Sequence, residues 1–270
     1  MMKINGVYYH VETIGDGAHH LLMLHGFTGS GRSFQDIIVG FENREDYTFI
    51  LVDQLGHGKT DAPVHNERYR MEKVLVDLKS ILDRLSISSV SIYGYSMGGR
   101  VALSFAVAYP KLVSKLVLES ASPGLEKMED RSARIKADER LAERIEKDGV
   151  KSFVDFWTNI PLFQSQKSLP VIKQGAIYQQ RVSNSPVGLA NSLRGLGTGM
   201  QPSNWNYLDK IDCPVLLAAG ELDEKFVLIA QEMKKRIEKS VFFKISGAGH
   251  AIHVEQPRKF GKIVSEFLSN

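Results

Sequence analysis

Short apolar runs that alternate with amphipathic stretches constrain the fold of this 270-residue chain more than any other feature. Continuous runs rich in Val, Ile and Leu are typical of parallel strands that are covered on both faces. Stretches with helical spacing of apolar residues lie between most of them, at 71–85, 98–110 and 226–239. This alternation predicts a mostly parallel, doubly wound α/β sheet. The runs are HLLMLHG (20–26), YTFILVDQ (47–54), VSIYG (90–94), KLVLES (115–120), PVLLAAG (214–220) and SVFFKISG (240–247).

Two segments depart from this alternation. Residues 4–17 alternate in character and contain a glycine-rich turn, which predicts an antiparallel hairpin at the edge of the sheet. From Pro123 to about Trp205 no strand-like run appears, and the interval is too long for a loop. We therefore expect a single domain over residues 1–270, with a helical cap insertion at about 123–205 that stands over one end of the sheet.

The composition excludes several classes of partner. The 34 basic and 31 acidic residues are spread along the chain and leave a net charge of +3, so we expect no nucleic-acid partner. One cysteine, Cys213, allows no disulfide within the chain. The N-terminus has no apolar signal-peptide core, and no run approaches the roughly 18 apolar residues of a membrane helix. We expect a cytoplasmic protein that does not insert into membranes.

A serine stands between two glycines directly after one of the predicted strands. The segment Gly94-Tyr95-Ser96-Met97-Gly98 has the G-x-S-x-G pattern, with a strand before it and a helical pattern after it. In that context the pattern predicts a tight turn that holds the serine above the sheet as a nucleophile or base. A serine in an ordinary glycine-rich turn is the alternative, so the partners of Ser96 decide between the two.

Ser96 needs an imidazole to take its proton and a carboxylate to orient that imidazole. Asp223 follows the predicted strand 214–220, and His250 follows the last predicted strand. The order Ser96, Asp223, His250 is the chain order of the α/β-hydrolase triad. Other residues in comparable loops remain as alternatives: Glu221 and Asp53 for the acid, and His57 and His253 for the base.

The segment LHGFTGSG (24–31) follows an inner strand and has glycines that expose backbone amides. In this fold the amide after the nucleophile, here Met97, pairs with an amide of the early loop to stabilise an oxyanion. We assign the second amide to Phe27. An ordinary strand-to-helix turn is the alternative for this loop.

Basic residues near the triad and in the insertion suggest an anionic substrate. Arg100 lies one helical turn after Ser96, although for an isolated arginine a position at the surface is the favoured alternative. If several of these cations converge, the substrate carries carboxylates. The other candidates are Arg131, Arg134, Arg181, Arg194 and Lys225.

Segments spread over nearly the whole chain resemble the MenH family, the 2-succinyl-6-hydroxy-2,4-cyclohexadiene-1-carboxylate synthases. Those in the insertion matter most, because generic hydrolases lack them. The segments are GYSMGGR (94–100), SPGL (122–125), FW (156–157), QRVSN (180–184), LANSLRGLGTGMQPSNW (189–205), LDEKF (222–226) and GHAIHVEQP (249–257).

The resemblance implies an α/β-hydrolase fold and a lyase without metal or other cofactor, which eliminates pyruvate from a small polycarboxylate substrate. Ser96 and His250 would act as the base, and the anion hole would hold an enolate oxygen. The resemblance implies a substrate-binding role for Tyr95, Arg100, Trp157, Arg181 and Lys225, and for Tyr95 and Trp157 packing in the core is the alternative. For the cap arginine both Arg131 and Arg134 fit, and we prefer Arg134 by its spacing from SPGL.

Two other classes of protein share these motifs. A carboxylesterase or carbon–carbon bond hydrolase would use Ser96 as a covalent nucleophile. A ligand receptor on the same fold would bind a small molecule under the cap. Turnover of simple aryl esters would favour the first, and a partner protein would favour the second.

Overall fold

A seven-stranded sheet forms the centre of the molecule, in a computed structural model that describes residues 1–270. The strand order is β3-β5-β4-β6-β7-β8-β9; β3 runs antiparallel to β5, and all other neighbours are parallel. The six predicted runs correspond to β4 through β9, so the mostly parallel α/β sheet is confirmed. These strands are β3 (Val11–Ile14), β4 (His19–Leu24), β5 (Tyr47–Val52), β6 (Val90–Tyr95), β7 (Val113–Glu119), β8 (Val215–Gly220) and β9 (Ser240–Ile245).

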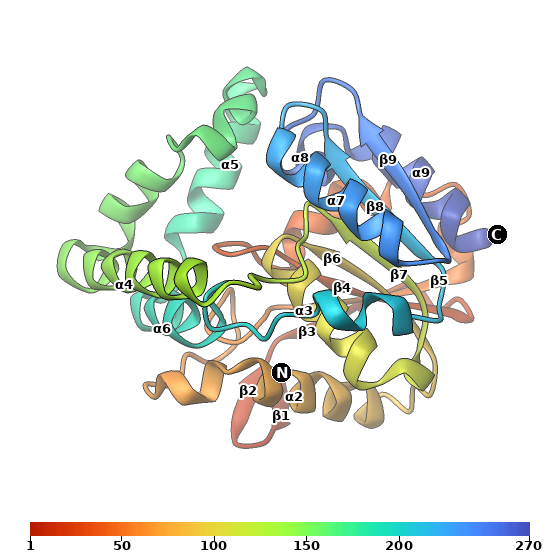
Figure 1. Cartoon of the computed structure of the whole chain (residues 1–270), viewed down its shortest axis with the longest axis horizontal. Coiled ribbons are helices and arrows are strands. Elements are labelled where there is room, and N and C mark those ends of the chain that lie inside the picture. The colour runs from red at the N-terminus through yellow and green to blue at the C-terminus, as the bar shows by residue number, and fades with distance from the viewer.

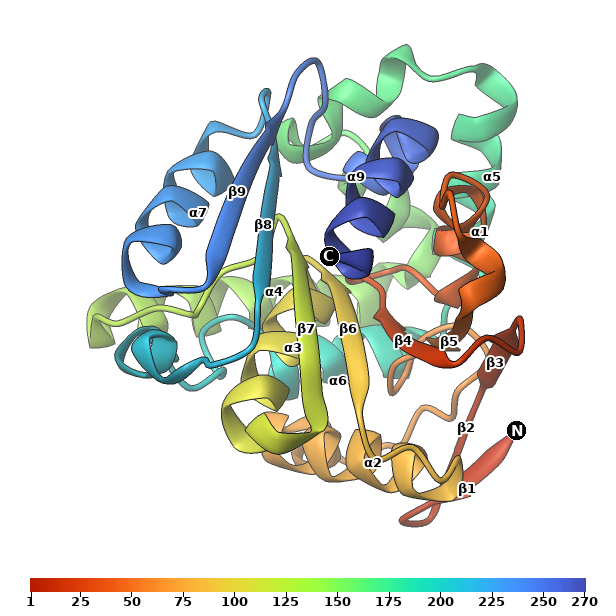
Figure 2. The ribbon, with the colours of Figure 1, turned by 90° about the vertical axis from the view of Figure 1, so that its right-hand side faces the viewer.

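Helices cover both faces of this sheet, as Figure 2 shows. In β4, Leu22 and Leu24 face the core beneath α2, α3 and α7, whereas Leu21 and Met23 face the core beneath α1 and α9. Because successive residues point to opposite faces, a strand covered on both sides must be apolar throughout. The helices are α1 (Gln35–Ile38), α2 (Met71–Arg84), α3 (Met97–Ala108), α7 (Glu224–Arg236), α8 (Ile252–Glu255) and α9 (Pro257–Ser269).

The N-terminal hairpin differs from the prediction. Strands β1 (Met2–Ile4) and β2 (Val7–Tyr9) pair with each other in a separate two-stranded sheet, and only β3 joins the edge of the main sheet. The hairpin is tied to α2, because the Tyr9 hydroxyl donates to the buried carboxylate of Asp77 at 2.6 Å. Arg68 donates to the same carboxylate at 2.6 Å. A buried polar anchor on a helix therefore draws the hairpin away from the sheet edge.

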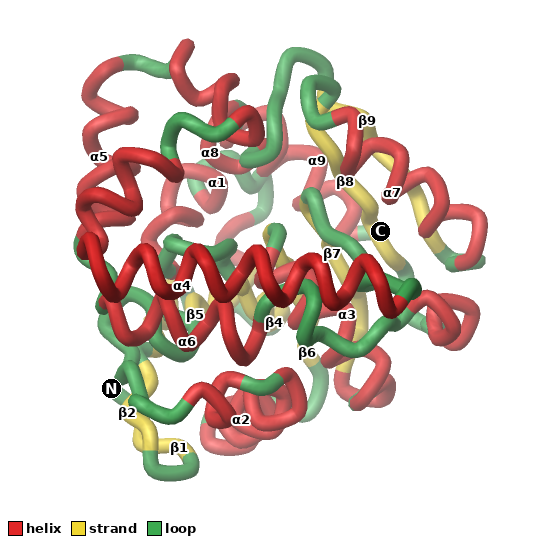
Figure 3. The backbone as a smooth tube through the Cα atoms, turned by 60° about the vertical axis from the view of Figure 1, so that its left-hand side comes forward, coloured by secondary structure: helices red, strands yellow, loops and turns green.

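Helices and turns fill the chain between β7 and β8, which we call the helical insertion (residues 120–214). Its helices gather at one side of the molecule (Figure 1). In Figure 3, α4 crosses in front of the strands. Residues of α4 and α6 form a small apolar core of their own, which includes Ile145, Phe153 and Leu189. None of the helices combines the length and the apolar character that a membrane span requires. The insertion contains α4 (Met128–Trp157), α5 (Val171–Val182) and α6 (Pro186–Leu196).

Short 3-10 helices of three to eight residues complete the structure and join the longer elements. Gly149 interrupts α4 with φ 80° and ψ 163°, so this helix bends rather than running straight through its 30 residues. The 3-10 helices are η1 (Gly31–Phe34), η2 (Arg44–Asp46), η3 (Asn66–Tyr69), η4 (Pro110–Leu112), η5 (Pro161–Ser168) and η6 (Trp205–Lys210).

Candidate active site

Ser96 lies in the turn between β6 and α3, with φ 51° and ψ −109°. A positive φ is uncommon for a residue with a side chain and costs conformational energy. The turn is held by the backbone of the neighbouring strand, because the Ser96 N–H donates to the Glu119 carbonyl at 2.9 Å. The strained turn fixes the serine side chain at the carboxyl end of the central strand.

The two glycines of the motif are required by space. A Cβ atom at Gly94 would lie 2.4 Å from the carbonyl oxygen of Gly98, and one at Gly98 would lie 1.9 Å from that of Leu24. Both contacts are with backbone, which cannot move aside without displacing a strand or the helix. The G-x-S-x-G pattern thus follows from how closely α3 approaches β6 and β4.

Ser96, His250 and Asp223 form a continuous hydrogen-bonded chain. His250 Nε2 lies 2.9 Å from Ser96 Oγ, and His250 Nδ1 lies 2.6 Å from Asp223 Oδ2. Both His250 and Asp223 are buried. With Nδ1–H donating to the carboxylate, Nε2 is left to accept the serine proton, which is the arrangement that makes a serine reactive.

The alternative acids and bases lie elsewhere. Glu221 accepts from Ser246 Oγ and the Gly247 N–H, and Asp53 accepts from the N–H groups of Gly31 and Lys59. Of the alternative bases, His57 is buried behind Phe27, and burial lowers the pKa of this imidazole to about 3. His253 contacts Glu119 and makes no hydrogen bond to Ser96.

The two amides of the predicted oxyanion hole belong to Phe27, in the loop after β4, and to Met97, directly after the serine. Met97 is the first residue of α3, where the N–H has no partner within the helix. The Phe27 N–H donates to no acceptor in the chain. A Cβ at Gly26 would lie 2.6 Å from the Tyr95 ring, so this loop packs directly against the serine turn. Their role as an oxyanion hole stays a prediction that this placement supports.

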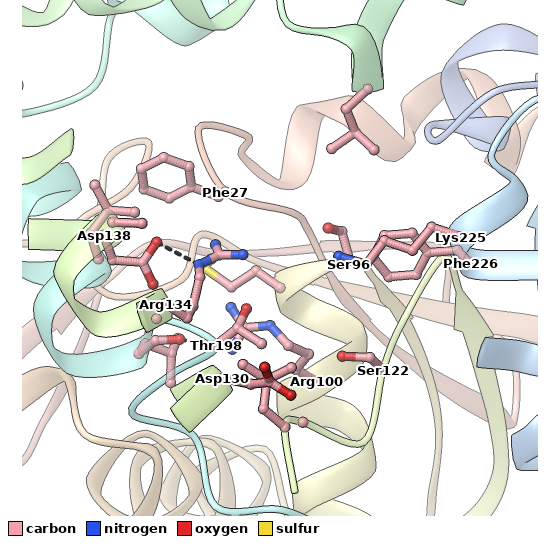
Figure 4. A pocket seen from close by; sticks show the side chains of 18 of the residues that line it. Phe27, Ser96, Arg100, Ser122, Asp130, Arg134, Asp138, Thr198, Lys225 and Phe226 are labelled. Atoms are coloured by element: carbon pink, nitrogen blue, oxygen red, sulfur yellow. Dashed lines mark hydrogen bonds and ion pairs between the residues drawn. The ribbon is translucent and has the colours of Figure 1, made fainter. Parts of the chain in front are cut away.

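A cavity of about 820 Å³ opens in front of Ser96 (Figure 4). Phe27, Ser96, Met97 and His250 all line it, so the serine, its base and both residues of the predicted oxyanion hole border one cavity. Its size suits a small organic molecule. The substrate candidates on its wall are Arg100, Arg134, Trp157 and Lys225.

Arg100 is held by the insertion. Its Nη1 donates to the Leu196 carbonyl at 2.8 Å and to Gln201 Oε1 at 3.0 Å. Burial, together with the nearby charge of Arg134, lowers the pKa of Arg100 to about 10. The side chain therefore remains a cation at neutral pH and is not the surface arginine of the alternative reading.

Of the two cap arginines, only Arg134 lines the cavity. Its Nε donates to Asp138 Oδ1 at 2.8 Å, one helical turn further along α4. Arg131 instead donates to the Gly199 carbonyl at 3.2 Å. Arg194 pairs with Glu139 and Glu146 and does not reach the cavity.

Tyr95 and Arg181 lie outside this cavity. They line a separate one of about 50 Å³, behind the loop that carries Phe27. Arg181 is 6% exposed, and its guanidinium lies 4.4 Å from the centre of the Phe163 ring. Its Nη2 donates to Gln166, whereas its buried Nη1 has no partner. The structure therefore does not bring these two residues together with Arg100 and Arg134.

Comparison with known proteins agrees with this geometry. The family model described as alpha/beta hydrolase fold matches residues 19–257. A Bacillus subtilis (strain 168) protein, provisionally named a 2-succinyl-6-hydroxy-2,4-cyclohexadiene-1-carboxylate synthase, is 48% identical over 267 residues, which is 98% of this chain and 96% of that protein. This chain belongs to the MenH family of α/β hydrolases.

Other MenH relatives match at lower identity. A synthase of the same name from Salmonella paratyphi C is 31% identical over 89% of this chain and 90% of that protein. The structure of MenH from S. aureus superposes with a TM-score of 0.91 at 38% identity, covering 96% of this chain and 98% of that one. An esterase from Thermogutta terrifontis, at 24% identity and a TM-score of 0.85, shares the fold.

Two residues that hold Arg100 and Arg134 in place were not among the predicted site residues. Asp138 orients Arg134, and the i, i+4 spacing of an acid and a base on a helix could have indicated this pair. Gln201 orients Arg100 from 101 positions away, and no sequence pattern signals that contact.

Proposed function

We propose that this chain is a lyase that eliminates pyruvate from 2-succinyl-5-enolpyruvyl-6-hydroxy-3-cyclohexene-1-carboxylate. The product is 2-succinyl-6-hydroxy-2,4-cyclohexadiene-1-carboxylate, an intermediate of menaquinone biosynthesis, and no cofactor takes part. The 48% identity to a family member over 98% of the chain carries the proposal. A cytoplasmic location and the absence of a nucleic-acid partner belong to the same proposal.

In this reaction Ser96 and His250 act as a base. Ser96 Oγ, deprotonated through His250, removes the ring proton beside the ketone. The N–H groups of Phe27 and Met97 stabilise the enolate oxygen that forms. The enolate then re-forms the ketone as the carbon–oxygen bond to the enolpyruvyl group breaks, which leaves a conjugated diene. His250 returns the proton, and the departing group leaves as pyruvate.

The cations around the cavity would bind the carboxylates of the substrate. Arg100, Arg134 and Lys225 face the cavity, which supports their assignment as carboxylate ligands. Trp157 also lines it, and its buried Nε1–H has no acceptor in the chain, so it can donate to a substrate oxygen. Trp157 stacks on Phe153 at 5.4 Å as well, so packing and binding roles coexist.

We propose that residues 123–205 act as a cap within a single domain of residues 1–270. Arg134 and Trp157 of α4 supply part of the cavity wall opposite Ser96. Tyr95 and Arg181 would contact the substrate only after a movement that joins the 50 Å³ cavity to the larger one. Phe27 lines both cavities, which makes its loop the partition that such a movement would displace.

The test is pyruvate release from the freshly made substrate, followed through lactate dehydrogenase. We expect rapid release from the wild type, and a fall of about 10⁴-fold or more in kcat for Ser96→Ala, because the triad acts as a unit. A reaction without enzyme measures spontaneous elimination, and a p-nitrophenyl ester serves as a hydrolase substrate. Ester cleavage without pyruvate release would move this chain among the hydrolases.

A further inference from the structure

A second histidine–carboxylate pair lies beside the triad, and the reaction proposed above gives it no role. Glu119, at the end of β7, is 0% exposed, and His253, at the start of α8, is 1% exposed. His253 Nδ1 lies 2.9 Å from Glu119 Oε2, and the His253 N–H donates to Oε1 at 3.1 Å. The Tyr93 hydroxyl donates to the same carboxylate.

Glu119 contacts both the turn that carries Ser96 and the segment that follows His250. Its backbone carbonyl accepts the N–H of Ser96 at 2.9 Å, and its side chain holds His253, three residues after His250. One residue at the end of β7 therefore connects the turn that carries the serine with the turn that carries the base. No other carboxylate in the chain makes both of these contacts.

The aromatic packing extends the same connection. The Tyr95 ring lies 4.5 Å from the His253 ring and 5.4 Å from the His250 ring, measured between centroids. The other end of the turn is also held, because the Gly249 N–H donates to Glu255 at 2.7 Å. His250 thus lies between two anchored neighbours, Gly249 and His253.

The polar contacts of Glu119 are fully buried, which makes them directional and costly to disturb. A buried carboxylate must keep its donors, because losing one leaves an uncompensated charge in an apolar surrounding. Burial, together with the charge of Glu119, raises the pKa of Tyr93 well above its ordinary value, so its hydroxyl remains a donor. Apolar residues of similar volume could fill this space, but they would not fix the angle of the turn.

We propose that Glu119 and His253 are positioning residues, which hold His250 Nε2 at hydrogen-bonding distance from Ser96 Oγ. The inference rests on the proposed function in one respect only, namely that Ser96 and His250 act together. Neither Glu119 nor His253 hydrogen-bonds to Ser96 Oγ or to the His250 ring, so their effect is on the geometry of the catalytic pair.

The test compares His253→Leu with His253→Asn. Leucine removes the side-chain donor, whereas the asparagine amide places an N–H where Nδ1 stands and can donate to Glu119. We expect His253→Leu to lower kcat by about 10- to 100-fold, as a misplaced base would. We expect KM to change less than kcat, because His253 does not line the cavity in front of Ser96. His253→Asn should recover most of kcat.

A matched pair of tyrosine variants separates geometry from stability. Tyr93→Phe removes a donor to Glu119, and Tyr9→Phe removes a donor to Asp77, a buried carboxylate on α2 that does not line the cavity. We expect both variants to lower Tm, and only Tyr93→Phe to lower kcat. If the two have the same kcat, or if His253→Leu retains wild-type kcat, the positioning role is wrong.

The rate at which a fluorophosphonate modifies Ser96 gives a readout that does not depend on the substrate. We expect this rate to fall in His253→Leu and to recover in His253→Asn, in parallel with kcat. If the wild type releases no pyruvate and labelling still falls in His253→Leu, the proposed lyase function is wrong and the positioning role stands. Labelling of His253→Leu at the wild-type rate would overturn the positioning role whatever the substrate.

Discussion

At the scale of single residues, the cavity arginines are oriented by protein partners before any substrate arrives. Arg134 is held at Nε by Asp138, and Arg100 is held at Nη1 by Leu196 and Gln201. The remaining N–H groups of each guanidinium are then available for a carboxylate in a fixed direction. Such prior ordering reduces the entropy that binding would otherwise cost.

Removing a cavity arginine should therefore weaken substrate binding more than chemistry. We expect Arg100→Ala to raise KM and to lower kcat/KM by an amount equivalent to about 2–4 kcal/mol if it meets a buried carboxylate. The matched control is Arg194→Ala, which removes an insertion arginine that pairs with Glu139 and Glu146 away from the cavity. Steady-state kinetics that are equal for the two variants would contradict the assignment of Arg100.

Asp138 should make stability depend on pH. Burial raises the pKa of this carboxyl above its ordinary value of 3.8, although Arg134 acts in the opposite direction. The folded chain then keeps a proton that the unfolded chain has lost. The contribution of this group to the free energy of unfolding is therefore present below pH 3.8 and is lost as pH rises through the raised pKa.

Asp138→Asn tests this dependence, because asparagine keeps the shape of the side chain and does not titrate. In urea unfolding across the acidic range, we expect the stability of the variant relative to wild type to increase as pH rises. A constant difference between the two proteins at every pH would show that the pKa of Asp138 is not raised.

The sequence correctly predicted that Ser96, Asp223 and His250 come together, and there is a physical reason for this. Ser96, Asp223 and His250 each follow a strand end, and parallel strands bring their carboxyl ends to one edge. The choice between Arg131 and Arg134 could not be made that way, because it depends on how α4 is rotated against the cavity. The separation of Arg181 from the main cavity likewise depends on packing around Phe27 and Phe163.

At the scale of elements, the close approach of α3 to the sheet should be intolerant of added atoms. A Cβ at Gly98 would lie 1.9 Å from a backbone oxygen of β4, so we expect Gly98→Ala to lower the free energy of unfolding by about 3 kcal/mol. Gly175, inside α5, has no atom within 4 Å of the position of its Cβ. There we expect Gly175→Ala to stabilise the protein by about 0.5–1 kcal/mol.

Chemical denaturation of the two alanine variants measures this contrast. Both replace a helical glycine by alanine, so the intrinsic gain in helix propensity is shared and the packing differs. Equal stabilities would mean that α3 can withdraw from β4 at little cost. The packing of α3 against β4 would then be looser than the structure shows.

Most elements were predictable because their apolar periodicity reflects burial directly. Strands β4 to β8 are covered by helices, and α2, α3 and α7 present an apolar side to the sheet, whereas the edge strand β9 buries only Ile245. The N-terminal hairpin was assigned to the sheet edge because its alternating residues also suit that position. Its actual attachment depends on a contact between Tyr9 and Asp77, 68 positions apart, which periodicity does not encode.

At the scale of the whole molecule, the insertion is attached to the sheet unevenly. Helix α6 buries eight of its residues, whereas α5 buries only Arg181. After α5, Asn184 donates to the Thr28 carbonyl at 2.9 Å and accepts from the Gly58 N–H at 3.0 Å. The C-terminal end of α5 is therefore tied to the loop that carries Phe27, whereas the rest of the helix is held mainly by exposed polar contacts, such as Lys173 with Asp36 and Tyr178 with Asp155.

Hydrogen exchange followed by mass spectrometry should detect this difference. A helix with few buried contacts opens locally at low free-energy cost, so we expect amides of α5 (Val171–Val182) to exchange faster than those of α6 (Pro186–Leu196). Adding the diene product should slow exchange in α5 if Arg181 binds one of its carboxylates. Arg181→Ala should abolish that slowing, and Arg194→Ala should preserve it. Equal exchange of α5 and α6 in the free protein would contradict the uneven attachment, and slowing that persists in Arg181→Ala would remove Arg181 from the binding set.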